Sequence, residues 1–453
     1  MAALFNNLLI NMNSVRYQPF LINLISGRRK LLSGSEFILV KSMLKKDTNK
    51  FNEYEHSLFC AFRAEKQFVT KEDRITIEKK MCEGGYFENS DTYTNDYSFS
   101  VEITRNCNIN CVYCYVHKRR NPSMSMTKFH IDRIYDFYSK YADDKNKIYN
   151  TPFIRVTGGE PLVNHKVVSV MNYLSRKWPN SKMRMITNGV NLLKYYNYLP
   201  TDKLDSVSVS VDGKQDAHRK RQLQSSLFNT DVHDDIMKGI KLLLDNGINV
   251  TLSSKVDKSN YREYPEFVNF LKNEGFFAYA NFRMEAGIVN DFSNPLDIND
   301  NFNSLADIYK INDFFVDTGC QVRIVLSSLV KLYQAIYRKQ NTPFLPKHHI
   351  CSVKILSKFY FACDGNVYFC DSPDEDKSAI GSYLGESSLD IEAARKLLSR
   401  NVVLHEKCRH CIYKFVCLGG CPMSARIKSE EMTCGAFSCE EILDNLEFDI
   451  SWN

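Results

Sequence analysis

The segment Tyr97-Ser-Phe-Ser-Val-Glu-Ile-Thr104 runs directly into Arg105-Asn-Cys-Asn-Ile-Asn-Cys-Val-Tyr-Cys-Tyr115, and these two stretches decide the fold and the chemistry. The first stretch alternates apolar and polar residues, which is typical of a β-strand. The second is a CxxxCxxC loop that places Cys107, Cys111 and Cys114 after this strand. Three thiolates can bind only three irons of a [4Fe–4S] cube, so a cluster in this loop would keep one iron open for a small-molecule ligand.

A second loop, Thr157-Gly-Gly-Glu-Pro161, ends another strand-like run, Phe153-Ile-Arg-Val156. Because glycine has no Cβ, Gly158 and Gly159 let the backbone come close to a ligand and adopt otherwise strained angles. Together with the cysteine loop, this pattern resembles the radical S-adenosylmethionine (SAM) enzymes. The resemblance implies that the methionine part of SAM chelates the open iron, and that an electron from the cluster cleaves SAM to give a 5′-deoxyadenosyl radical. It assigns the backbone of Gly158 and Gly159, with Glu160, to the methionine amino group.

The following residues alternate between strand-like and helical patterns. Further strand-like runs lie at 183–186, 206–211, 250–253 and 276–284, and helical patterns lie near 128–143, 166–178, 232–246 and 262–274. Six strands with parallel-type crossovers predict an α/β layer whose functional residues lie at the carboxyl ends of the strands. The resemblance sharpens this prediction to a partial (β/α)6 barrel of the TIM type.

Two polar segments, Thr187-Asn-Gly189 and Ser210-Val-Asp-Gly213, follow predicted strands at these ends. Asn-Gly and Asp-Gly are also common in ordinary turns. The resemblance implies that four side chains of these segments line the ribose and methionine of SAM, namely Thr187, Asn188, Ser210 and Asp212.

An arginine that contacts the SAM carboxylate commonly follows the Asp-Gly pair in this family, after His-Asp. Here the chain reads His218-Arg-Lys-Arg221, with a spacing that differs by one residue and without the acidic partner. Arg219 and Arg221 are therefore competing candidates, of which we name Arg221. A solvated basic helix start is the alternative.

The C-terminal part of the chain is rich in cysteine, because nine of the 15 cysteines lie in residues 351–453. Gly365 stands five positions before Cys370. The other cysteines of the pattern are Cys351, the run Cys408-x2-Cys411-x5-Cys417-x3-Cys421, and the distal Cys434 and Cys439. This pattern resembles the SPASM extension of peptide- and protein-modifying radical SAM enzymes, which binds two auxiliary [4Fe–4S] clusters.

The resemblance also implies a ligand set for these clusters. The first would be bound by Cys351, Cys370 and Cys421, and the second by Cys408, Cys411, Cys417 and one distal cysteine. Two distal cysteines are present where the pattern needs one, and Cys439 is slightly favoured over Cys434. Cys363 is a candidate fourth ligand of the first cluster; alternatively, that iron is open to substrate.

Composition restricts the other interpretations of these cysteines. CxxC pairs often bind structural zinc, and a disulfide framework is a further alternative. The start of the chain shows no secretory signal and no membrane span, so we expect a cytoplasmic protein, in which this cysteine density indicates metal binding. Cys60, Cys82 and Cys320 lie outside every motif. The net charge of +6 is modest, and no basic pattern interleaved with aromatic residues indicates nucleic acid.

The length of 453 residues predicts about three units. We expect a small N-terminal α+β domain at 1–95, a radical SAM core at 96–320 and a cysteine-rich SPASM domain at 345–453. The N-terminal domain is rich in Phe, Tyr and Leu among charged residues. It either docks the leader of a substrate peptide, for example by adding a strand to a sheet edge, or is a structural cap.

The sequence therefore predicts a radical SAM maturase that oxidatively modifies or crosslinks a ribosomally synthesised peptide (RiPP). Such an enzyme needs an external low-potential electron donor, and we expect no nucleic-acid or membrane partner. The auxiliary clusters would take up an electron from the substrate or bind it directly. The alternative enzyme is of the anaerobic sulfatase-maturase type, which forms formylglycine from Cys or Ser. The non-enzymatic alternative is a zinc-stabilised binding protein. The sequence identifies no general base, although Glu285 and Lys255 are candidates that face the barrel.

Overall fold

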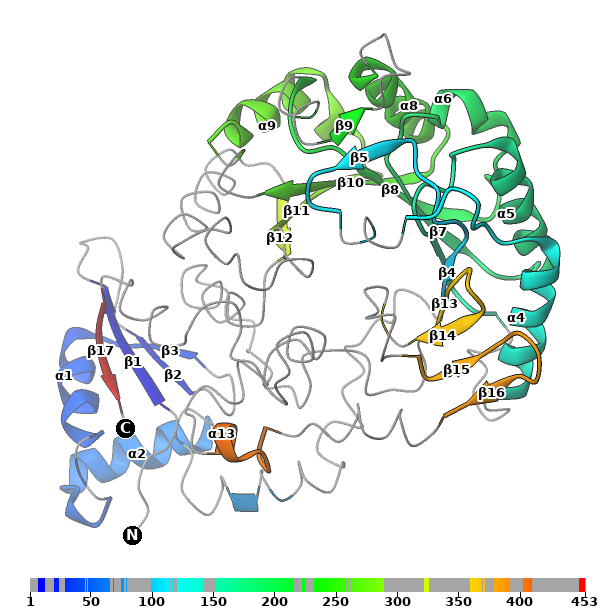
Figure 1. The fold of residues 1–453 in the computed structure, drawn as a ribbon. Helices are drawn as coiled ribbons and strands as arrows, with labels where there is room; N and C mark the ends of the chain where they lie inside the picture. Colours follow the sequence, from blue (N-terminus) through cyan, green and yellow to red (C-terminus); the bar gives the residue numbers. More distant parts are fainter. Residues whose placement is uncertain are drawn as a thin grey trace.

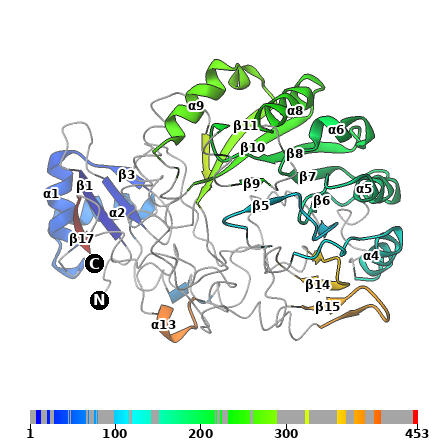
Figure 2. The ribbon, with the colours of Figure 1, turned by 45° about the horizontal axis from the view of Figure 1, so that its top comes forward.

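The computed structural model describes fifteen ranges of the chain and a few positions between them. These ranges are 7–12, 20–23, 29–44, 48–65, 99–114, 120–141, 151–215, 222–224, 232–256, 262–288, 322–325, 359–368, 379–390, 402–409 and 448–452. Figures 1 and 2 show that they form a large curved sheet with helices on its outside, and a small sheet with two helices.

The large sheet contains eight parallel strands in the order β12-β11-β10-β8-β7-β6-β4-β13. Their bounds are β4 Phe99–Glu102, β6 Ile154–Thr157, β7 Met183–Thr187, β8 Leu204–Ser210, β10 Asn249–Val256, β11 Phe282–Ile288, β12 Val322–Val325 and β13 Phe359–Phe361. The helices on the convex side are α4 Lys128–Tyr141, α5 His165–Lys177, α6 Leu192–Tyr195, α8 His233–Asp245 and α9 Tyr264–Asn273 (Figure 1). This arrangement confirms the predicted α/β layer of a partial barrel.

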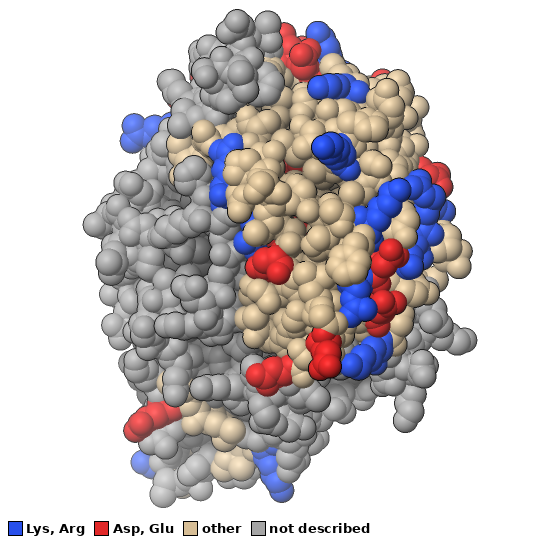
Figure 3. Space-filling view, turned by 45° about the vertical axis from the view of Figure 1, so that its right-hand side comes forward, with Lys and Arg blue, Asp and Glu red and all other residues tan. Residues whose placement is uncertain are grey.

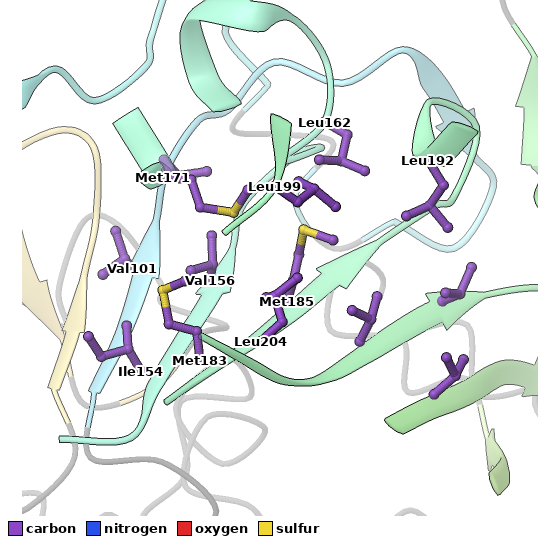
Figure 4. Close-up of a cluster of buried hydrophobic side chains, with 14 of the residues drawn as sticks. Val101, Ile154, Val156, Leu162, Met171, Met183, Met185, Leu192, Leu199 and Leu204 are labelled. Carbon is purple, nitrogen blue, oxygen red and sulfur yellow. The ribbon is translucent and has the colours of Figure 1, made fainter. Parts of the chain in front are cut away.

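Alternation along the strands separates the two faces of this sheet. Val101, Val156 and Met185 of three neighbouring strands are fully buried and form an apolar layer with Met171 of α5 (Figure 4). Burial of an apolar side chain of this size stabilises the fold by about 1.5–3 kcal/mol. The residues that alternate with them along the strands point to the other, concave face, and several are polar: Arg155 Nε donates to Ser100 Oγ at 3.0 Å, for example. The concave face of the barrel is therefore suited to polar ligands.

The six predicted strands are present, but one of them begins later than predicted. The expected strand at 276–284 starts as a 3-10 turn, η5 Phe276–Ala278, and becomes β11 only at Phe282. Gly275, with φ of 78°, ends the preceding helix in the left-handed region and sets up this turn. Two further parallel strands, β12 and β13, extend the sheet at its two ends. β12 lies just beyond the expected boundary at 320, and β13 lies within the expected 345–453 unit.

An antiparallel meander continues the sheet from β13 through β14 Asn366–Tyr368, β15 Gly381–Ser382 and β16 Ser388–Leu389. Gly365, with φ of 94°, forms the turn between β13 and β14. A Cβ at this position would press on the Leu384 side chain, so both the backbone angle and the space favour glycine. Through β13, this meander is thus continuous with β4, the first strand of the barrel.

The small sheet has the order β17-β1-β2-β3, with all neighbours antiparallel. Its strands are β1 Asn7–Met12, β2 Phe20–Asn23, β3 Arg29–Leu31 and β17 Phe448–Trp452, and its helices are α1 Gly34–Met43 and α2 Glu53–Ala64. Capping boxes start both helices, at Ser33 with Glu36 and at Asn52 with Glu55. The edge strand β17 therefore comes from the far end of the sequence.

The outer helical surface carries charges of both signs. Figure 3 shows Lys and Arg side chains interspersed with Asp and Glu over the described part of the face that it draws. Ion pairs between helices include Lys177 of α5 with Asp132 of α4 at 2.8 Å. In the described part of the chain, no helix combines the length and apolarity needed to cross a membrane.

Candidate active site

The cysteine loop lies at the carboxyl end of β4, where the sequence predicted it. Its strand β5, Ile109–Cys111, pairs antiparallel with β9, Gln222–Gln224, so that Cys111 lies opposite Gln222. Figures 1 and 2 both show β5 and β9 side by side near the middle strands of the large sheet. Arg221 itself lies outside the described residues, but it directly precedes the residue opposite Cys111.

The three thiols of this loop lie close enough to influence one another's protonation. Burial, followed by the nearby Glu160 carboxylate, raises the pKa of Cys107 to about 11. Burial and then the Cys114 thiol raise the pKa of Cys111 well above its usual value of 9.0. Thiols in such a place keep their protons at neutral pH unless a cation stabilises the thiolates. The irons of a cluster would supply that positive charge, so the three residues fit the cofactor that their spacing predicts.

The described ranges contain no site with the ligand geometry of a single metal ion. There, no three His, Cys, Asp or Glu side chains converge on a single metal ion. A cube takes one thiolate for each iron, so its three cysteines need not converge in this way.

The Gly158-Gly159 backbone packs against the start of the cysteine loop. Gly159 N donates to Thr104 O at 2.7 Å, and Glu160 N donates to Asn106 O at 2.8 Å. A Cβ at Gly158 would overlap the carbonyl oxygen of Thr104, and a Cβ at Gly159 would overlap that of Asn106. The glycines are thus required by a close approach to the chain's own backbone, while the predicted approach to a ligand stays a prediction.

Glu160 joins this loop to the end of β7. The side chain is 1% exposed, and its oxygens accept hydrogen bonds from Thr187 Oγ1 at 2.6 Å, Asn188 N at 2.7 Å and Leu162 N at 2.8 Å. Burial raises the pKa of Glu160 to about 7 despite these donors. The structure therefore brings together Glu160, Thr187 and Asn188 beside the cysteine loop, and the Glu160 carboxylate orders them.

Asp212 joins the cysteine loop to the other half of the sheet. It is fully buried, and its oxygens accept from Lys255 N at 2.7 Å and from the Tyr113 hydroxyl, which lies between Cys111 and Cys114 in sequence. Ser210 is the last residue of β8 and lies opposite Ser253 of β10. His218 Nδ1 accepts from Asp212 N at 3.3 Å. The predicted residues of β8 are thus at the same end of the sheet as the cysteines.

The predicted auxiliary ligands are only partly described. Cys351, Cys411, Cys417, Cys421, Cys434 and Cys439 lie outside the described residues, while Cys370 and Cys408 are half-buried. Cys363 is 4% exposed, and its thiol donates to Glu102 Oε2 at 3.5 Å. Burial, and then the Glu102 carboxylate, raises the pKa of this thiol.

Sequence reasoning missed two side chains that organise the cysteine loop. Arg105 donates to Glu102 Oε2 at 3.0 Å and to Asp364 Oδ2 at 2.8 Å, and Tyr113 donates to Asp212. Both residues lie inside the loop sequence, but Asp364 and Asp212 are 259 and 99 positions away. No local spacing connects such partners, so only the fold reveals them.

Comparison with known proteins agrees with this geometry. Residues 101–271 match the model of the Radical SAM superfamily, whose members are enzymes that use SAM and an iron–sulfur cluster. The GTP 3′,8-cyclase of Petrotoga mobilis is 33% identical over 174 residues, which are 37% of this chain and 50% of the relative. A probable GTP 3′,8-cyclase of Methanopyrus kandleri is 27% identical over 167 residues, or 36% of this chain and 50% of the relative. This chain thus spans about half the length of these curated relatives.

Solved structures show the same fold over more of the chain. Native anSMEcpe with bound AdoMet has a TM-score of 0.57 at 17% identity and covers 76% of this chain and 96% of its own. Streptococcus suis SuiB bound to precursor peptide SuiA has a TM-score of 0.54 at 14% identity and covers 96% of this chain and 99% of its own. Residues 101–271 thus match the Radical SAM model, and the solved structures show the expected α/β fold with a partial barrel.

Proposed function

We propose that this protein is a radical SAM peptide maturase that oxidatively modifies or crosslinks a ribosomally synthesised peptide. The observation that carries the proposal is the placement of a CxxxCxxC loop with three half-buried thiols against the Gly158-Gly159 backbone and the ends of β7 and β8. When bound, a [4Fe–4S] cluster and SAM supply the one-electron cleavage that yields a 5′-deoxyadenosyl radical.

The chain's own residues hold these groups in place. Cys107, Cys111 and Cys114 would bind the cluster, while the loop of Gly158 and Gly159 fixes the start of the cysteine loop through two backbone hydrogen bonds. The residues proposed to line SAM are Glu160, Thr187, Asn188, Ser210, Asp212 and Arg221. Because Glu160 already accepts three hydrogen bonds from the protein, its contact with the amino group of SAM would be an additional one.

A peptide substrate is supported by two of the solved structures. SuiB, solved bound to its precursor peptide, is similar over 96% of this chain, far more than the barrel alone. anSMEcpe has also been solved with AdoMet and the Cp18Cys peptide, at a TM-score of 0.55 and 18% identity over 76% of this chain. β17 pairs with the β1 edge of the small sheet, so we propose that the β3 edge receives the peptide leader by strand addition.

The C-terminal region, 345–453, is proposed to be a SPASM domain with two auxiliary clusters. Cys351, Cys370 and Cys421 would bind the first, and Cys408, Cys411, Cys417 and Cys439 or Cys434 the second. If Cys363 were the fourth ligand of the first cluster, its thiol would have to leave the Glu102 oxygen. An iron open to substrate is the alternative that keeps this hydrogen bond. The enzyme would act in the cytoplasm with an external low-potential electron donor.

The test of the proposal is SAM cleavage by the anaerobically reconstituted and reduced protein. We expect 5′-deoxyadenosine from the parent and none from the variant in which Cys107, Cys111 and Cys114 are all replaced by Ala. Iron should fall from about twelve to about eight per chain in this variant, because one cube of three is lost. Equal 5′-deoxyadenosine formation by parent and variant would contradict the assignment.

Formylglycine formation is the second candidate, favoured by the TM-score of 0.57 to anSMEcpe. Mass spectrometry of treated peptides separates the two reactions. A crosslink removes two hydrogens from the peptide and keeps every heavy atom. Formylglycine made from Cys also exchanges the sulfur for an oxygen, and formylglycine made from Ser loses two hydrogens but carries an aldehyde, which a hydrazine reagent labels before the mass is measured. We expect the first outcome with a precursor peptide encoded beside this gene, and no aldehyde in a sulfatase peptide.

A further inference from the structure

Two asparagine side chains form a pair directly beside the first cysteine of the loop. Asn188 Nδ2 lies 2.8 Å from Asn108 Oδ1 and 3.9 Å from Cys107 Sγ, so it donates to both. Asn108 is the residue after Cys107, and Asn188 is 7% exposed at the end of β7. The two amides come from separate parts of the chain, just before β5 and just after β7, and meet at the place where the cluster would be bound.

Their orientation follows from the surrounding hydrogen bonds. Asn188 Oδ1 accepts from Val190 N at 3.0 Å, which turns Nδ2 toward Cys107 and Asn108. Reversing the Asn188 amide would bring Nδ2 against the Val190 N–H and Oδ1 against the Asn108 oxygen, which is unfavourable on both sides. Asn108 must therefore present its oxygen to Asn188, and its Nδ2 is directed elsewhere.

This remaining donor, Asn108 Nδ2, is buried and has no hydrogen-bond acceptor among the described residues. A buried donor without an acceptor costs about 1–3 kcal/mol, and native proteins rarely keep one. The side chain is held by Asn188, so it cannot turn this donor to solvent without losing that hydrogen bond. A ligand that brings an acceptor into the cysteine loop would remove the cost.

We propose that Asn108 Nδ2 donates a hydrogen bond to a sulfur atom of the cluster and, together with the Asn188 donor to Cys107, raises the reduction potential of this cluster. The inference rests on the proposed function, because it requires a cluster at the three cysteines. An N–H group directed at a cluster sulfur stabilises the electron-rich reduced form more than the oxidised form. Asn108 is a positioning and tuning residue in this account, and it takes no part in bond breaking.

The experiment is a redox titration of the reconstituted full-length protein, followed by EPR without SAM. Addition of SAM to a parallel sample identifies the signal of the cluster at Cys107, Cys111 and Cys114, because only this cluster has an iron open to SAM. Asn108→Leu removes the donor and keeps similar volume. Asn108→Asp keeps the oxygen that accepts from Asn188 and replaces the donor by a carboxylate oxygen. Asn110→Leu is the matched control, since Asn110 is an exposed asparagine of the same loop.

We expect the midpoint potential to become more negative in Asn108→Leu and still more negative in Asn108→Asp, with no change in Asn110→Leu. An unchanged midpoint potential in Asn108 variants that contain the cluster overturns the inference. This also holds if the variants bind SAM more weakly at an unchanged potential, because the acceptor of the Asn108 donor would then be SAM and not a cluster sulfur. Loss of the cluster in both Asn108 variants but not in the control also overturns it, because Asn108 would then serve assembly. A parent protein that binds no cluster overturns the proposed function as well, so the two failures are distinguishable.

Discussion

Replacing Asp364 by Asn should lower the free energy of unfolding by about 2 kcal/mol, because the change breaks a buried ion pair between the cysteine loop and the C-terminal meander. Arg105 Nη2 lies 2.8 Å from Asp364 Oδ2, and the two side chains are 6% and 19% exposed. A hydrogen bond to a charged group contributes about 1.5–3 kcal/mol. Asn can still accept from Asn366 N, which lies 2.9 Å from Oδ1, but it brings an amide N–H toward the guanidinium. Glu102 remains as a counter-ion at 3.0 Å, which keeps the loss below that of an uncompensated charge.

Arg105→Met should cost more, about 3–5 kcal/mol, because it leaves the fully buried Glu102 carboxylate without its cation. The double variant with Asp364→Asn should be more stable than the sum of the two single losses predicts. The difference, a coupling free energy of about 1–2 kcal/mol, measures the contact itself, since residues that share a partner are not additive.

Urea unfolding of the apoprotein measures these values through the fluorescence of Trp178. The ring of Trp178 lies 5.3 Å from that of Phe99, on the same strand as Glu102. The chain has two tryptophans, so a Trp452→Phe background makes Trp178 the sole reporter. Glu274→Gln is the control, because its ion pair with Lys241 is largely exposed and should contribute about 0–1 kcal/mol. Equal stability of Asp364→Asn and the parent, or a coupling free energy of zero, would refute the reasoning.

Three other predictions concern the loops and ends of the chain. Gly159→Ala should reduce both iron uptake at the cysteine loop and SAM cleavage, because the new Cβ would overlap the Asn106 carbonyl. Gly34→Ala is the control and should change neither, since a Cβ at Gly34 would meet nothing within 4 Å; equal iron contents of the two variants would contradict the close packing. Cys439→Ala should lower auxiliary iron more than Cys434→Ala, since only one distal cysteine is needed as a ligand, and the opposite result would exchange the two assignments. Removal of residues 1–95 together with 448–452 should lower peptide affinity, measured by fluorescence anisotropy, while SAM cleavage without peptide persists; unchanged affinity in a folded variant would favour the structural cap.

Periodicity was sufficient to predict the central strands and helices of the barrel. β6, β7, β8 and β10 carry alternating or continuous apolar residues, and the loops between them are long enough for one helix each. The predicted start of β11 was wrong because the apolar run Phe276-Phe-Ala278 has the composition of a strand but forms a 3-10 turn. Only the left-handed Gly275 shows that a turn precedes the strand. β12 and β13 were missed because four- and three-residue strands have too few residues to establish a period, and their partners are far away in sequence.

The sequence predicted those site residues that directly follow a strand. It did not predict contacts between side chains that are far apart in the sequence. The carboxyl ends of parallel strands share one edge of the sheet, so Glu160, Thr187 and Asn188 could be expected beside the cysteines. The contacts of Arg105 with Asp364 and of Asn188 with Asn108 depend on rotamers and on strand register. Neither quantity can be read from a single sequence.

The pairing of β17 with β1 has a consequence for the synthesis of the chain. β1 ends at Met12 and its partner begins at Phe448, so the ribosome must add most of the chain between them. At about 5–20 residues per second, the β1 edge waits roughly 20–90 s for this partner. An open sheet edge can pair with other chains during that time. Nascent protein should therefore need protection at its first strand, and an extension fused after residue 453 should delay or disturb the closing of this sheet more than an insertion in the exposed helical surface.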